Sequence, residues 1–98
     1  MPAVARQGDS TTTGHGCDSV TTVIGPSSNV FANNIGVERA GDPCAPHTIR
    51  SGKSCVPHSA VINSGSGTVY ANGKPLARIG DSTDGGAIIS GSGTVFAG

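Results

Sequence analysis

The residues GSGTVYANGKPLARIGD at positions 65–81 predict two short β-strands joined by a tight turn. Threonine, valine and tyrosine in 68–71 favour the extended conformation of a strand. Asn72-Gly73 follows, and this pair favours the positive φ angles that a two-residue hairpin turn requires. The next strand passes through 76–79 and ends at Gly80-Asp81. The stretch therefore predicts a β-hairpin.

The same pattern occurs earlier in the chain, at an offset of 39 residues. SNVFAN at 28–33 and ERAGD at 38–42 form this copy, in which Arg again follows Asn by six residues and Gly-Asp follows Arg by two. Partial copies stand at the two ends, as ARQGD at 5–9 and GSGTVFAG at 91–98. The repeat is therefore cut circularly, with its second half at the start of the chain and its first half at the end.

The composition limits how this chain can be stabilised. Its 98 residues include sixteen Gly, two Phe, one Tyr and no Trp, so the large aromatic side chains that fill most cores are nearly absent. A domain of this size is marginally stable even with a good core. We therefore expect a metal, cross-links or a partner to contribute to its stability.

Charge and hydropathy exclude several functional classes. Six basic residues balance six acidic ones, so the chain lacks a basic surface for phosphates and we predict no nucleic-acid partner. No apolar run is long enough to span a bilayer. Residues 1–6 lack the apolar segment of a signal peptide, so we expect assembly in the cytoplasm.

Outside the repeats the sequence predicts more strand and little helix. The β-prone runs at 20–24 and 87–89 indicate further strands, and no segment has helical periodicity beside a capping residue. The connector 43–59 is predicted to be an irregular loop without secondary structure. It holds two of the three His and two of the three Cys, so we expect metal ligation to order it.

The three cysteines cannot all pair within one chain. Cys44 and Cys55 each precede a histidine by three residues, His47 and His58 respectively, and no secretion signal supports a disulfide framework. A metal site is therefore favoured over a disulfide. A Cys2His2 site formed by these four residues, without His15, is an alternative.

Aspartates follow glycine at matched positions of the repeats, at Asp9, Asp42 and Asp81. A catalytic pair of carboxylates would need a cleft, whereas aspartate after glycine commonly shapes a turn by accepting hydrogen bonds from backbone amides two residues on. We interpret these aspartates as structural and expect the repeated arginines to pair locally. Cys55 and His58 could form a nucleophile and its base, a role that zinc binding would remove.

Together these features resemble the PAAR-repeat proteins, named for a Pro-Ala-Ala-Arg tetrad. The tetrad occurs here as PLAR at 75–78, with degenerate versions in PAVAR at 2–6 and GVER at 36–39. The GHGC run at 14–17 and the Arg-x-Gly-Asp endings match as well. The resemblance covers the whole chain.

The resemblance implies an all-β fold, a small cone of short β-strands and hairpins with pseudo-threefold symmetry and a zinc ion near its apex. It also implies a single domain, residues 1–98, without an effector extension. Three Val-aromatic-Ala segments are predicted to lie at related positions around the base of the cone. These segments are 30–32, 69–71 and 95–97.

The resemblance further implies a non-enzymatic tip that caps and sharpens the trimeric β-helical spike of a contractile injection machine for membrane puncture. The partner would be a valine-glycine-repeat spike of a type VI secretion system or the central spike of a contractile phage tail baseplate, with one chain per trimer. Effector cargo would be a further partner, and contact with the target membrane would be transient. The protein would lie at the virion tail tip or be secreted by the injection machine. A zinc-binding adaptor and a small zinc hydrolase, whose ion would keep an open position for water, are the alternatives.

One structural Zn²⁺, held by three His and one Cys, is also implied. The implied ligand set is His15, His47, Cys55 and His58, since the chain has no further histidine. Cys44 and Cys17 remain alternatives to Cys55 as the fourth ligand. Asp84-Gly85-Gly86 stands where many relatives carry Cys-Gly, and this departure makes the set of candidate ligands smaller.

Overall fold

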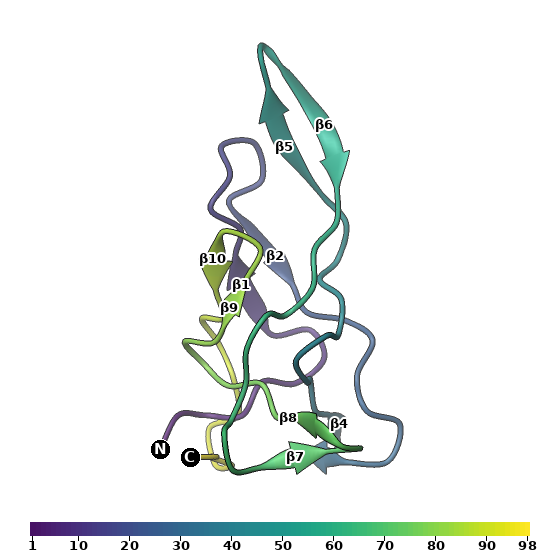
Figure 1. Ribbon diagram of the computed structural model, residues 1–98, viewed down its shortest axis with the longest axis vertical. Helices are drawn as coiled ribbons and strands as arrows, with labels where there is room; N and C mark the ends of the chain where they lie inside the picture. Colours follow the sequence, from purple (N-terminus) through teal and green to yellow (C-terminus); the bar gives the residue numbers. More distant parts are fainter.

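The computed structural model describes residues 1–98 and contains only β-structure (Figure 1). Ten short strands pair into five separate two-stranded antiparallel sheets. Their bounds are β1 Ser10–Thr12, β2 Val20–Thr22, β3 Phe31–Ala32, β4 Ile35–Gly36, β5 His47–Ser51, β6 Ser54–His58, β7 Tyr70–Ala71, β8 Lys74–Pro75, β9 Ser82–Thr83 and β10 Gly86–Ala87. The predicted all-β class is confirmed. The chain forms no helix of the length and apolar character needed to cross a membrane.

The molecule is elongated, with principal extents of 41 × 23 × 21 Å. Figure 1 shows β4, β7, β8 and both chain termini at its broad lower end, which we call the base. Strands β1, β2, β9 and β10 lie in the middle, and the β5–β6 hairpin alone forms the upper end, which we call the apex.

The repeats build the base through matched hairpins. β3 pairs with β4 and β7 pairs with β8, each across a two-residue turn. Asn33 and Asn34 have φ angles of 57° and 64°, and Asn72 and Gly73 have 56° and 76°. The positive φ angles predicted for these turns are therefore present, and asparagine occupies three of the four positions because it tolerates this region better than other side chains.

The two chain ends together complete a third unit of the base. The amide of Val37 donates to the carbonyl of Val30, and the amide of Leu76 donates to that of Val69, both at 3.0 Å. The amide of Val4 donates to the carbonyl of Val95 at the same distance. The start of the chain therefore supplies the strand that the third, C-terminal copy lacks, as a circularly cut repeat requires.

The three repeats are also joined by a closed ring of backbone hydrogen bonds. Ala5 N–H donates to the Ala77 carbonyl at 3.0 Å, Ala77 N–H to the Glu38 carbonyl at 2.9 Å, and Glu38 N–H to the Ala5 carbonyl at 3.0 Å. All three residues are completely buried. This ring joins the three segments to one another through backbone groups alone.

The apolar core is small and consists of two clusters. One lies around the base and the other includes two members of the ring. The first comprises Val4, Ala32, Val37, Ala71, Leu76 and Ala97, and the second comprises Ala5, Val23, Cys44, Ile62, Ala77 and Ile88. Neither cluster contains an aromatic side chain, as the composition leads one to expect.

The repeated aspartates shape turns, as predicted, but with a different donor. Asp9, Asp42 and Asp81 each accept a hydrogen bond from the backbone amide of the arginine three residues earlier, at 2.7, 2.8 and 2.8 Å. The same arginines also pair with these carboxylates through Nε, at 2.7–3.2 Å. The predicted donor, an amide two residues after the aspartate, is therefore replaced by one three residues before it.

The connector 43–59, predicted to be an irregular loop, contains the longest hairpin of the molecule. β5 and β6 pair in register from His47↔His58 to Ser51↔Ser54, so this prediction is wrong. Gly52, with φ of 63°, occupies the first turn position, where such an angle suits a two-residue hairpin. The β-branched residues of the two strands favour the extended conformation, whereas Pro46, just before β5, and Pro57, within β6, are typical of loops.

Candidate metal centre

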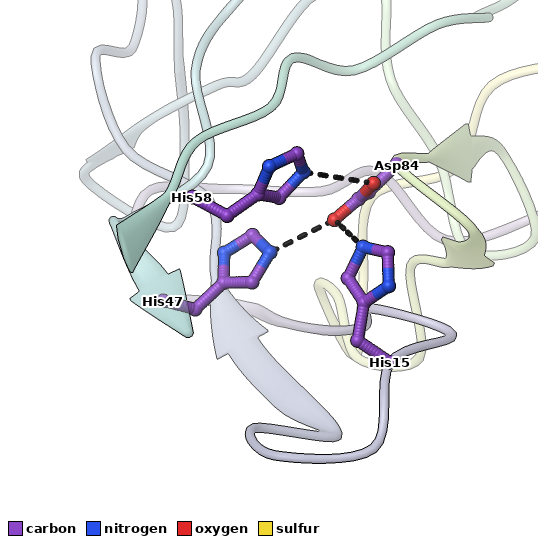
Figure 2. Close-up of side chains that lie close together, drawn as sticks. All are labelled: His15, His47, His58 and Asp84. Carbon is purple, nitrogen blue, oxygen red and sulfur yellow. Dashed lines mark hydrogen bonds and ion pairs between the residues drawn. The ribbon is translucent and has the colours of Figure 1, made fainter. Parts of the chain in front are cut away.

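Two of the three histidines face each other across the apical hairpin. His47 begins β5 and His58 ends β6, and they are direct cross-strand partners. Opposite residues of an antiparallel pair place their side chains on the same face at short separation. The hairpin therefore presents two imidazoles side by side at its inner end (Figure 2).

His15 and Asp84 reach the same point from two different turns. His15 belongs to the loop between β1 and β2, and Asp84 to the turn between β9 and β10. The two turns meet where Gly14 contacts the backbone of Gly85, and a Cβ atom at Gly14 would collide with that backbone. Gly14 also has a φ of 75°, so both its missing side chain and its conformation allow the close approach.

The Asp84 carboxylate lies at the centre of the three imidazoles. His15 Nε2 and His47 Nε2 lie 2.7 and 2.8 Å from Asp84 Oδ2, and His58 Nε2 lies 3.3 Å from Oδ1. One donor atom from each of the four residues can be chosen so that all lie within 4.8 Å of one another. Four side chains from four separate elements therefore converge on one small volume.

The electrostatics of this cluster favour a negative carboxylate among the imidazoles. Burial alone would raise the pKa of Asp84, but hydrogen bonds with His47, His58 and His15 outweigh it and lower that pKa. Burial alone would lower the pKa of His47, but its contacts with the Ala45 carbonyl and with Asp84 outweigh burial and raise it.

The Ala45 carbonyl also orients the His47 ring. It lies 3.1 Å from His47 Nδ1, where it can accept a hydrogen bond when the proton is on that nitrogen. Nε2 is then free as a ligand. This is the usual arrangement of a metal-binding histidine, whose second nitrogen donates to a carbonyl or carboxylate.

Cys55 does not take the ligand role that the resemblance implied. Cys55 Sγ is bonded to Cys17 Sγ, so Cys55 lies outside the group of four. Cys55 and His58 are three residues apart on β6, and side chains at odd spacing on a strand point to opposite faces. The disulfide also differs from the sequence analysis, which favoured metal ligation over any disulfide.

Cys44, the remaining alternative, is a buried free thiol in the second core cluster. It also lies outside the group of four donors. Burial is the largest cause that raises the pKa of its thiol, and Asp84 adds to it. Cys44 therefore behaves as a neutral core residue.

The structure thus brings together His15, His47 and His58 from the predicted set and adds Asp84, which the sequence analysis missed. The signal for Asp84 was its position, since it stands where many relatives carry a cysteine. Three imidazole nitrogens and a carboxylate oxygen form a donor set that first-row divalent metals, zinc included, accept. The cluster could therefore bind a metal ion.

Comparison with known proteins identifies the family. The PAAR motif matches residues 13–90 of this 98-residue chain, a span that includes all four residues of the cluster. No significant match to a curated protein was found. The chain belongs to the PAAR-motif family, a structural family with a spike-tip role in secretion or phage machinery.

Proposed function

We propose that this protein is a non-enzymatic tip that caps the blunt end of a trimeric β-helical spike and sharpens it for membrane puncture. The machine would be a type VI secretion system or a contractile phage tail. One chain would seat on one trimer through the base and present the β5–β6 hairpin at the leading end. The chain would therefore act at the virion tail tip or leave the cell with the spike.

The observation that carries this proposal is a set of three exposed aromatic residues at matched positions of the base. Phe31, Tyr70 and Phe96 are 58%, 57% and 48% exposed. Each follows an exposed valine, and large apolar side chains grouped on a small protein mark an interaction surface. Three like groups suit a partner with three equivalent subunits.

The backbone holds these three aromatic residues in the same way. A serine lies four residues before each aromatic residue. Its hydroxyl oxygen accepts a hydrogen bond from the backbone amide of the valine that precedes the aromatic residue. These donor–acceptor distances are 3.0, 2.8 and 2.8 Å for Ser27, Ser66 and Ser92. We infer that the hydrogen-bonded ring above them marks a pseudo-threefold axis that continues the axis of the spike.

We propose that the cluster holds one structural Zn²⁺ through His15, His47, His58 and Asp84. Four protein donors complete a tetrahedral set, as in structural zinc sites, whereas a hydrolase needs an open position for water. Zinc would tie the apical hairpin to the two turns beneath it. The disulfide between Cys17 and Cys55 joins the same hairpin to the β1–β2 loop. Both links would resist bending of the tip.

The capping proposal is tested by co-purifying the chain with candidate trimeric β-helical spikes and measuring the stoichiometry by native mass spectrometry. We expect one chain per trimer and a buried area of roughly 1,200 Å² or more. Phe31→Asp and Tyr70→Asp should each abolish the complex because they place a charge in the interface. Val20→Asp is the matched control, since Val20 is similarly exposed, at 51%, but belongs to β2 away from the base.

Two outcomes would contradict capping. One is a stoichiometry of three chains per trimer, which would mean that each spike subunit binds its own copy. The other is full binding by both aspartate variants, which would place the contact elsewhere and favour a zinc-binding adaptor that tethers cargo.

A further inference from the structure

Glu38 differs from the two residues that occupy the same position in the other repeats. Ala5, Glu38 and Ala77 form the ring of backbone hydrogen bonds, and each precedes a repeated arginine. Two repeats therefore carry a methyl group at this position and the third carries a carboxyl group. The difference makes Glu38 the only ionisable member of the ring.

The Glu38 side chain is fully enclosed and has no polar partner in the protein. Its exposed fraction is 0%, and neither Oε1 nor Oε2 makes a hydrogen bond with any protein group. Its two ring neighbours belong to the apolar cluster with Val23 and Ile62. An ionised carboxylate in such a position is strongly disfavoured, because neither water nor hydrogen bonds compensate its charge.

We propose that Glu38 is a proton-binding site at the centre of the fold, occupied at neutral pH, so that the folded protein holds this carboxyl group as the neutral acid. The ligand is a single proton, taken up when the chain folds. Loss of that proton at alkaline pH weakens the junction of the three repeats. The inference concerns the folded domain and does not depend on the capping of a spike.

The charges nearest to Glu38 support its protonation. Burial is the largest influence and raises the pKa of Glu38 from 4.5 to about 8. The negative charges of Asp42 and Asp9 raise it further, and only the Arg39 guanidinium acts in the opposite direction. Arg39 is already bound to the Asp42 carboxylate at 2.7 Å, so its charge is largely compensated.

The remaining groups around the ring do not offer a counter-charge either. Arg78, which follows the third ring residue, is paired with Asp81 at 3.0 Å. The Cys44 thiol lies in the same core cluster as the two alanines. Burial and the nearby carboxylates of Asp84 and Glu38 raise the pKa of that thiol, so it stays neutral. No cation is therefore free to stabilise an ionised Glu38.

The sign of the pH dependence follows from the direction of the shift. A carboxyl group with a higher pKa in the folded state than in the unfolded state stabilises the fold at low pH, and this contribution is lost as pH rises through the folded pKa. A shift from 4.5 to about 8 makes folding roughly a hundredfold less favourable at pH 9 than at pH 6.

The sequence allows a direct measurement, because Glu38 is the only glutamate in the chain. In the purified full chain labelled with ¹³C-glutamate, the Glu38 carboxyl carbon gives one titrating side-chain resonance from glutamate. We expect its midpoint above pH 7. A midpoint below pH 7 would overturn the proposal, since the carboxyl group would then be ionised at neutral pH.

Urea unfolding at pH 6 and pH 9 gives an independent test. Glu38→Gln removes the ionisable group with little change of shape, and Glu38→Ala restores the residue found in the other two repeats. Between pH 6 and pH 9, we expect the unfolding constant of the wild type to rise roughly a hundredfold more than that of either variant. An equal pH dependence in the wild type and both variants would contradict the proposal. The titration of the wild type decides the question if neither variant folds.

Discussion

The base and the apex of this molecule are built in opposite ways. At the base, three repeats use the same residue types for the same contacts, and the contacts are mostly made by the backbone. Near the apex, the metal centre takes two residues from the strands of one hairpin and two from turns elsewhere in the chain, and the contacts are made by side chains. Repetition can therefore create a closed base from a chain with few apolar residues. The narrow end is held instead by the histidine–aspartate cluster and the disulfide.

The reason for this difference is the amount of surface that each end can bury. Both apolar clusters include residues of the ring or the base hairpins, and the apical hairpin contributes to neither. A lone two-stranded hairpin is only marginally stable in water. The histidine–aspartate cluster and the disulfide therefore supply at the apex what apolar burial supplies at the base.

Metal removal should have the largest effect and should act first on the apex. Structural zinc contributes about 10 kcal/mol in small domains, more than the roughly 5 kcal/mol expected of this core. We expect a chelator to lower Tm by about 20 °C or more. Hydrogen exchange should show that amides of β5 and β6 lose protection before those of Ala5, Glu38 and Ala77.

His47→Ala is the control for chelation. This variant should have a low Tm that a chelator does not lower further, because it lacks a buried member of the cluster. An unchanged Tm of the chelated wild-type protein would show that the base is sufficient to stabilise the apex.

Loss of the disulfide should have the next largest effect. Cys17 and Cys55 are 38 residues apart in sequence, and closing a loop of this length stabilises a fold by up to about 4 kcal/mol. The stabilisation by the disulfide should be smaller here if zinc already restrains the neighbouring His15 and His58. Thermal unfolding of the double variant Cys17→Ser/Cys55→Ser with zinc present measures this loss. It does so without thiol reductants, which would themselves bind the metal.

The single variant Cys17→Ser should lose as much stability as the double variant, because one bond is lost in both. A markedly larger loss in the double variant, or a loss of zinc in Cys55→Ser alone, would indicate that the Cys55 thiol has a separate role.

Replacement of Asp84 should separate the two candidates for the fourth ligand. We expect Asp84→Asn to weaken zinc binding by at least about 100-fold, equivalent to roughly 2.7 kcal/mol, and Cys55→Ser to change it by only a few fold. Competition with a chromophoric chelator measures both. Equal losses in the two variants would return Cys55 to the ligand set.

Asp84→Cys offers a spectroscopic control for the same question. The Co²⁺ complex of this variant should gain a sulfur-to-cobalt charge-transfer band in the near ultraviolet, because thiolate replaces carboxylate. The wild-type complex should lack that band, and its presence there would show that a cysteine already binds the metal.

The sequence predicted the base better than the apex, for physical reasons. The turns at Asn33-Asn34 and Asn72-Gly73 depend on local φ preferences, which are readable in a few residues. The β5–β6 hairpin is hard to predict because prolines such as Pro46 and Pro57 are typical of loops, although Pro57 lies within an edge strand, where its missing N–H is tolerated.

The metal centre shows the corresponding limit for site residues. The histidines could be named because the chain has only three. The resemblance implied Cys55 as the fourth ligand, but its three-residue spacing from His58 separates the two side chains once both lie on a strand. Asp84 approaches only through the contact of two turns distant in sequence, which no local pattern records.

Exchange of turn residues between repeats should have the smallest effect and tests the repetition of the base. Asn34 and Gly73 occupy the same turn position, with φ angles of 64° and 76°. Asn34→Gly should stabilise the protein slightly and Gly73→Asn should destabilise it slightly, each by less than about 1 kcal/mol in urea unfolding. Gly73 has open space where a Cβ would lie, whereas Gly14, with a φ of 75°, does not. Gly14→Asn should therefore disrupt zinc binding although Gly73→Asn does not, and equal tolerance at both positions would mean that the apex is as adaptable as the base.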